Sequence, residues 1–201
     1  MRRLLIVGLL AAASCAFGAR QASAQAPATL HYTFEQDPKK IDWSRIYARA
    51  FLSFRTGEVG GTELGEKKDL GFGLLKINEE DWFEIANGSD GSGRSVIRDL
   101  GEHSWSDEIA VPVLAPLPEL KPGEQRLIKV DASADTHGKW AKTTAIFAKV
   151  RAGHVYAVRV VREGADLYAL FRVESHEQNE SCAITWRIVA APAAAAAGPG
   201  R

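Results

Sequence analysis

The sequence predicts an all-β protein that forms a single β-sandwich. The main observation is a regular alternation of apolar and polar residues in three consecutive stretches between residues 154 and 189, where aromatic and β-branched side chains recur. Loops rich in glycine and proline separate the other strand-like runs. Only residues 42–55 and 139–150 also fit a helical spacing, so we expect at most one short helix.

The three alternating stretches define two faces of the predicted sheet. The inward face carries the aromatic and aliphatic side chains of Tyr156, Val158 and Val160, of Leu167, Ala169, Phe171 and Val173, and of Cys182, Ile184, Trp186 and Ile188. Neighbouring residues of a strand point to opposite sides. We therefore expect Arg159, Arg172 and Arg187 to point outward together.

The first 24 residues have the pattern of a secretory signal peptide. Arg2 and Arg3 form a basic start, residues 4–13 form an apolar run, and Ala22-Ser23-Ala24 is a small-residue cleavage site. The apolar run is too short to span a bilayer. We expect export to the periplasm or the cell exterior, with the sandwich domain at residues 25–190.

Cys15 leaves a second mode of export open. Ala13 and Ser14 give it the small residues that precede the lipid-bearing cysteine of a bacterial lipoprotein, which would anchor the chain through Cys15. Ala12 stands where a larger aliphatic residue is more usual. Ordinary cleavage after Ala24 is therefore the favoured interpretation.

Cysteine usage limits how the fold is stabilised. After ordinary cleavage only Cys182 remains, so no intramolecular disulfide can form and stability must come from an apolar core. Cys182 shares a strand face with Ile184 and Trp186. We expect a buried, unreactive thiol.

Charge argues against two classes of partner. The chain carries 25 basic and 25 acidic residues, and removal of the signal peptide leaves 22 basic and 25 acidic residues, a net charge of −3. Interspersed charges of both signs are not typical of nucleic-acid binding or of an anionic membrane surface. We expect no nucleic-acid partner and no transmembrane span.

Shorter strands are predicted before the three alternating stretches. After a linker at residues 25–28, the expected strands are residues 30–34, 48–55, 71–77, 81–86, 95–100 and 125–131, with residues 144–150 leading into the core. Residues 42–55 and 139–150 remain open between helix and strand. The tail at residues 191–201 contains alanine, proline and glycine with little to pack, so we expect it to be disordered.

Prolines recur in residues 111–122, at positions 112, 116, 118 and 122. Proline lacks the amide that an interior strand donates to its neighbours. We therefore predict an extended connector or an edge, and not a central strand, for this segment.

One short run resembles a known family. In residues 150–160, Gly153 lies three residues before Tyr156, which opens an alternating strand. This run resembles the E–F corner of fibronectin type III and other immunoglobulin-like sandwiches. The resemblance implies that the Tyr156 hydroxyl bonds back to nearby backbone, that its ring packs in the core, and that Gly153 makes the turn. Because the chain exceeds the usual ~100 residues, we expect an enlarged immunoglobulin-like or jelly-roll sandwich.

Two groups of polar residues are candidates for binding. The first group lies in one loop and consists of His103, Trp105 and Asp107. This loop could present an imidazole, an aromatic plane and an acid to a ligand. Alternatively, it is a polar turn whose Trp105 folds back onto the sandwich. Arg159, Arg172 and Arg187 form either an anion-binding stripe or a solvated face whose arginines pair with acids such as Glu163 and Glu174.

No motif in the sequence indicates catalysis. The five histidines do not have metal-ligand spacing, no Gly-x-Ser-x-Gly elbow occurs, and residues 88–93 lack the Lys-Ser/Thr of a phosphate-binding loop. We therefore expect no metal or cofactor, and a non-enzymatic interaction or structural module with a protein or polysaccharide partner. The alternative is a carbohydrate-binding or carbohydrate-active domain, for which Trp82 or Trp105 would form an exposed platform.

The export prediction is tested by the intact mass of the protein recovered after secretion. We expect the mass of a chain that begins at Gln25 and carries no lipid. A chain that begins at a diacylglyceryl-modified Cys15 would instead establish the lipid anchor.

Overall fold

The computed structural model describes residues 26–32, 49–60, 68–77, 80–85, 93–119, 146–162 and 164–193. The predictions for the signal peptide, for the possible strand at residues 125–131, and for most of the tail lie outside the described residues. So do residues 42–48 and 139–145 of the two segments with a possible helical spacing. No described helix is long and apolar enough to cross a membrane.

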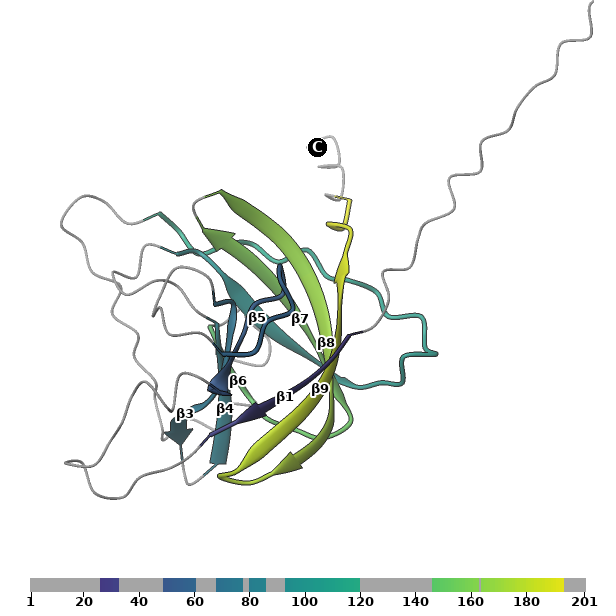
Figure 1. Cartoon of the computed structure of the whole chain (residues 1–201). Helices are drawn as coiled ribbons and strands as arrows, with labels where there is room; N and C mark the ends of the chain where they lie inside the picture. Colours follow the sequence, from purple (N-terminus) through teal and green to yellow (C-terminus); the bar gives the residue numbers. More distant parts are fainter. Residues whose placement is uncertain are drawn as a thin grey trace, which may run out of the picture.

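The described elements are strands in two packed antiparallel sheets, so the predicted β-sandwich is confirmed (Figure 1). The larger sheet contains, in spatial order, β1 (Ala26–His31), β9 (Ser181–Val189), β8 (Ala165–Glu177), β7 (His154–Arg162) and β5 (Val96–Glu102). The smaller sheet contains β2 (Phe51–Leu52), β3 (Leu70–Ile77), β4 (Glu80–Ile85) and β6 (Phe147–Lys149).

The three alternating stretches form the centre of the larger sheet. Strands β7, β8 and β9 are consecutive neighbours, and their register places Phe171 opposite Tyr156 on one side and opposite Trp186 on the other. The rings of Tyr156 and Phe171 stack with centroids 4.8 Å apart. The alternation in the sequence therefore predicted the strands and, apart from Ile188, the inward face correctly.

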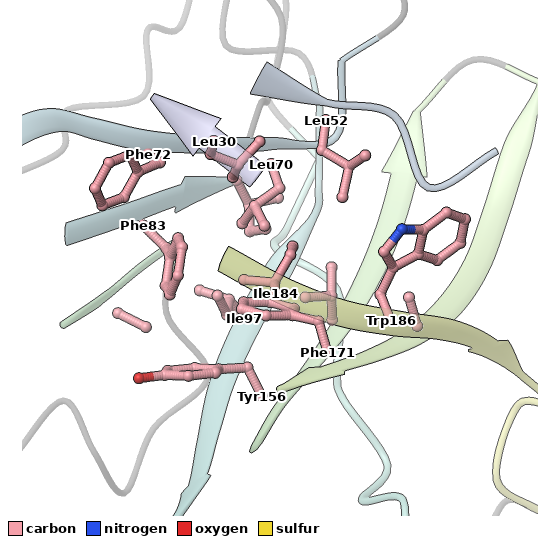
Figure 2. Close-up of a cluster of buried hydrophobic side chains, with 14 of the residues drawn as sticks. Leu30, Leu52, Leu70, Phe72, Phe83, Ile97, Tyr156, Phe171, Ile184 and Trp186 are labelled. Carbon is pink, nitrogen blue, oxygen red and sulfur yellow. The ribbon is translucent and has the colours of Figure 1, made fainter. Parts of the chain in front are cut away.

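The core fills the space between the two sheets (Figure 2). Phe83 of β4 crosses that space and meets Tyr156 and Phe171 edge-on, with centroids 5.3 and 5.0 Å apart. All three rings are fully buried. Burial of each such side chain stabilises the fold by about 1.5–3 kcal/mol, so this aromatic contact is a main link between the sheets.

The outer face of the larger sheet is also covered. Six buried residues form a second apolar cluster there, namely Val96, Leu114, Val155, Ala157, Tyr168 and Leu170. Leu114 comes from residues 103–119, which contain no strand or helix and which we call the strap. The proline-rich part of the strap is thus a connector, as predicted, and it packs on a sheet that is buried on both sides.

The corner before β7 has the geometry that the resemblance implied. The Tyr156 hydroxyl donates to the carbonyl of Lys149 at 2.7 Å and accepts from the amide of Arg151 at 3.0 Å. Gly153 has a φ of 81°, a conformation that side-chain-bearing residues rarely adopt. Burial raises the pKa of the Tyr156 phenol, so its proton stays in place to donate. The corner fixes the chain where it crosses from β6 in one sheet to β7 in the other.

Three details of the sequence prediction were wrong. The first strand begins at Ala26, not at residue 30, because residues expected to form a linker pair with β9 along the sheet edge. An edge strand tolerates Pro27 since part of its backbone faces away from the ladder.

The second strand is only Phe51–Leu52, and a turn follows at Phe54. Ile188 is 40% exposed, because it lies near the end of β9, beyond the closely packed core.

The corner predicts the effect of Tyr156→Phe. This change keeps the ring but leaves the Lys149 carbonyl and the Arg151 amide without their partner, so we expect the free energy of unfolding to fall by about 1–3 kcal/mol. Urea denaturation measures the change. The control is Tyr168→Phe, which should cost less because the Tyr168 hydroxyl makes longer hydrogen bonds, both 3.3 Å, to the backbone of Leu114. Equal losses in the two variants would contradict a special role for the corner.

Candidate functional site

The strap is held on the larger sheet by side chains. The first residue of the strap is His103, whose backbone amide donates to the carbonyl of Gly153 at 3.3 Å. The backbone carbonyl of His103 accepts from Arg172 Nε at 2.8 Å. Arg172 also pairs with Glu174. The start of the strap is therefore fixed to both β7 and β8.

Trp105 anchors the first turn of the strap. Its indole Nε1 donates to Thr185 Oγ1 of β9 at 2.6 Å, and the Thr185 hydroxyl in turn donates to Glu174. Arg187 of β9 lies under the ring, with its guanidinium carbon 4.6 Å from the ring centroid. Trp105 thus folds back onto the sheet, and one face of its ring is covered by an arginine.

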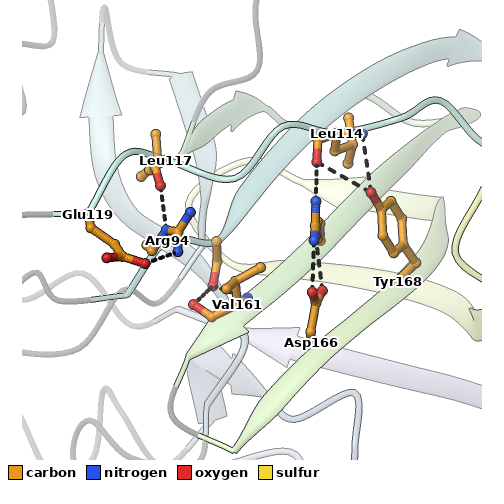
Figure 3. Close-up of polar contacts among 9 residues, drawn as sticks. Arg94, Leu114, Leu117, Glu119, Val161, Asp166 and Tyr168 are labelled. Atoms are coloured by element: carbon orange, nitrogen blue, oxygen red, sulfur yellow. Dashed lines mark hydrogen bonds and ion pairs between the residues drawn. The ribbon is translucent and has the colours of Figure 1, made fainter. Parts of the chain in front are cut away.

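Leu114 anchors the middle of the strap (Figure 3). Its side chain is fully buried in the second apolar cluster, and its backbone amide donates to the Tyr168 hydroxyl at 3.3 Å. Its carbonyl accepts from Arg159 at 2.9 Å. Arg159 also makes two hydrogen bonds to Asp166, at 2.9 and 2.7 Å, so one arginine joins the strap to the sheet and to a carboxylate.

Arg94 anchors the far end of the strap. Its Nε donates to the Leu117 carbonyl at 2.6 Å, and its own backbone carbonyl accepts from the Leu117 amide at 3.0 Å. A further terminal nitrogen of Arg94 lies 2.6 Å from Glu119 (Figure 3). The strap is therefore attached at both ends and in the middle.

The two predicted groups of binding residues lie side by side. The loop residues His103 and Trp105 meet the arginine stripe at Arg172 and Arg187, respectively. Asp107 closes the same turn, because its carboxylate accepts from the Ser104 amide at 2.7 Å and lies 3.6 Å from His103 Nδ1. Arg159 lies farther along the strap, at Leu114.

The three arginines of the stripe point outward as predicted, but their partners differ. Arg159 and Arg172 each donate to a strap carbonyl and to a carboxylate. Arg187 lies against the ring of Trp105, and within the described residues its buried Nε has no hydrogen-bond acceptor. Of the acids expected to pair with the stripe, Glu174 does so, and Glu163 lies outside the described residues.

Sequence reasoning missed the anchors Arg94, Leu114 and Tyr168. A signal for them was present in β7 and β8, where apolar residues also occupy the outward positions, including Ala157 and Leu170. Strands that are apolar on both sides are buried on both sides. That pattern predicts a cover but not which segment supplies it.

Other polar clusters in the described residues tie structural elements together. His176 Nε2 of β8 lies 2.8 Å from the buried Asp81 of β4, which also accepts from the Asn179 amide. His154 lies 3.0 Å from Asp99 of β5. Both pairs join neighbouring elements, and no group of three metal-ligating side chains occurs in the described parts of the chain.

A third cluster lies where β2, β3 and β7 meet. Asp69 is fully buried, with Oδ2 accepting from the Phe54 amide at 2.8 Å and Oδ1 lying 2.9 Å from Arg162, without the alignment of a hydrogen bond. Burial raises the pKa of Asp69, and Arg162 only partly opposes this effect. The Asp69 carboxylate thus joins the segments that carry Phe54 and Arg162, although its burial is unfavourable.

Cys182, Trp186 and Trp82 are core residues. Burial, with a smaller effect of Asp81, raises the pKa of the Cys182 thiol, which is the opposite of what activates a cysteine nucleophile. Trp186 packs edge-on against Phe54. Trp82 is only 5% exposed, so it offers no open platform to a sugar.

Comparisons with known proteins give no match, since no family model fits the chain and neither the curated proteins nor the solved structures provide one.

The Arg159–Asp166 pair predicts a pH effect. Hydrogen bonds from Arg159 hold the pKa of Asp166 below its ordinary value. A carboxyl with a lowered pKa stabilises the fold above its unfolded pKa of ~3.9, and this stabilisation is lost as the pH falls through the lower folded pKa. Because the Asp166 side chain is 52% exposed, solvent screening limits the effect, and Asp166→Asn should lower the free energy of unfolding at neutral pH by about 0.2–1 kcal/mol.

Urea denaturation of both proteins over a series of pH values falling from ~7 measures this effect, because protonation of Asp166 removes the charge that pairs with Arg159. The difference between wild type and Asp166→Asn should be full above the unfolded pKa of ~3.9 and should shrink as the pH falls through the lowered folded pKa. A difference that does not change with pH would show that the carboxylate charge does not contribute.

Proposed function

We propose that this chain is an exported, non-enzymatic interaction module that contacts its partner through the strap. The observation that carries the proposal is the strap itself, a long irregular segment that is nevertheless fixed at its ends and its middle. Irregular segments of this length are uncommon in compact domains and are usually either functional loops or disordered linkers. The anchors of the strap favour the first kind. Binding residues often lie on loops that a rigid scaffold holds in place.

The outward side of the strap supports this proposal. Leu114 is buried against the sheet, whereas its neighbour Val113 is 55% exposed. The strap has prolines at positions 112, 116 and 118, and these limit the amides available for pairing with a foreign strand. We therefore propose recognition through side chains on a fixed surface, and not through addition of a strand.

The corner at Tyr156 gives a second, weaker line of support. It resembles the corner of fibronectin type III and immunoglobulin-like sandwiches, whose connecting loops present binding residues in antibody variable domains. The proposal does not depend on membership of that family, because function is set by the site and not by the fold. A carbohydrate-binding domain is the alternative, and the burial of Trp82 and the covered ring face of Trp105 count against it.

A site-specific crosslink tests the proposal. A photo-reactive side chain at Val113 should give one discrete adduct in intact cells, because this position is exposed on the proposed contact surface. The matched control is the same side chain at Glu180, an exposed residue in the turn between β8 and β9. Excess protein without the photo-reactive group should compete the adduct away.

The composition of the adduct separates the two functions. A protein adduct from Val113 alone supports the interaction module. An adduct that resists protease but is cleaved by glycosidases would establish the carbohydrate alternative. The same adducts from Val113 and Glu180, or none from Val113, would show that the strap is not the contact surface.

A further inference from the structure

We propose that Arg187 and Trp105 form a subsite that binds a single carboxylate of the partner. The proposal rests on the interaction module proposed above and names the chemistry of what its strap recognises. Its starting observation is a difference among the three arginines of the stripe, Arg159, Arg172 and Arg187. Arg159 and Arg172 each have a carboxylate and a carbonyl as acceptors, whereas Arg187 has neither among the described residues.

The guanidinium of Arg187 is partly enclosed. It is held against the indole of Trp105, and only its Nε is both sealed from solvent and without an acceptor. Its terminal nitrogens therefore remain open to a ligand at the surface. An arginine in this setting presents a rigid fork of donors that matches the two oxygens of a carboxylate.

A chain of contacts fixes Trp105 in place. The indole Nε1 donates to Thr185, and the Thr185 hydroxyl donates to Glu174, which in turn pairs with Arg172. The ring cannot turn away from Arg187 without breaking the hydrogen bond to Thr185. The subsite is therefore organised before a ligand arrives, which lowers the entropy lost on binding.

The surrounding charges favour a carboxylate over a phosphate. Glu174 and Asp107 lie in the network around Trp105 and His103, and a doubly charged phosphate would be repelled by them more strongly than a singly charged carboxylate. Stacking of a sugar on Trp105 is disfavoured, because one ring face is covered by Arg187 and the side chain packs on the second apolar cluster. We therefore assign the carboxylate to a polypeptide, as an acidic side chain or a chain terminus, because an acidic sugar would gain little from stacking on Trp105.

Titration of the exported protein, labelled with ¹⁵N, tests the subsite. The probes are N-acetylglycinate and its uncharged amide at constant ionic strength. The carboxylate should cause saturable shifts of the Arg187 Nε–H and Trp105 indole resonances, because Nε belongs to the guanidinium whose terminal nitrogens would bind and the indole ring lies against that guanidinium. The amide should cause none. Equal shifts with both probes, or shifts that do not saturate, would overturn the proposal.

Two variants separate specific binding from general charge. Arg187→Gln should weaken binding at least tenfold, and Arg187→Lys should also weaken it, since lysine keeps the charge but not the fork. The control Arg98→Gln removes a half-buried arginine on a different strand, β5, and should leave the affinity unchanged. Spectra that superimpose outside the strap confirm that each variant is folded. An unchanged affinity in Arg187→Gln would refute the subsite.

Further measurements identify the source of the carboxylate and distinguish the carboxylate subsite from the interaction module proposed above. Glucuronate binding at least tenfold tighter than N-acetylglycinate would overturn the assignment to a polypeptide in favour of an acidic sugar. If N-acetylglycinate causes no saturable shifts but the photo-reactive side chain at Val113 still gives its adduct, the subsite is excluded and the interaction module stands. Loss of the Val113 adduct in Arg187→Gln, but not in Arg98→Gln, would show that partner contact uses this carboxylate.

Discussion

Burial of the larger sheet on both faces is the constraint on which the rest of this structure depends. Its inner face is covered by the smaller sheet through the contact of Phe83 with Tyr156 and Phe171. Its outer face carries Tyr168 and Leu170, which need a second cover. The chain has no further described sheet or helix for that purpose, and an irregular segment takes the role.

An irregular cover brings a difficulty that the arginines resolve. The strap has no ladder partner, so its backbone carbonyls near the sheet must find donors elsewhere or remain unsatisfied when buried. Arg172, Arg159 and Arg94 each donate to one of them, at His103, Leu114 and Leu117 respectively. Arginine suits this position because its long apolar stem packs on the sheet while its several N–H groups bond at the tip.

Arg187 departs from this pattern and is therefore the informative residue. It lies on the same outer face, but it supports the strap through the ring of Trp105 and not through a carbonyl. Within the part of the chain that the structure describes, its N–H groups thus have no acceptor. By contrast, the histidine–aspartate pairs at His176 and His154 bridge separate strands, so their chemistry is accounted for by the architecture. This difference is why the candidate site is located at Arg187 and not at a histidine.

The sequence by itself determined the sheet core, because alternation is a local property of a strand. It predicted which side of β7, β8 and β9 faces inward, the corner at Tyr156, the burial of Cys182 and the shared outward direction of Arg159, Arg172 and Arg187. It missed the early start of β1, because pairing along an edge depends on a partner more than 150 residues away.

Only the tertiary structure decided what covers the arginines. The strap contacts depend on residues such as Arg94 and Leu117, or Trp105 and Thr185, that are distant in the chain and have no shared periodicity. A sequence pattern shows that a side chain points outward, but its partner is fixed by where the chain returns after folding. For that reason the sequence identified Trp105 and Arg187 separately, and the folded chain alone placed one against the other.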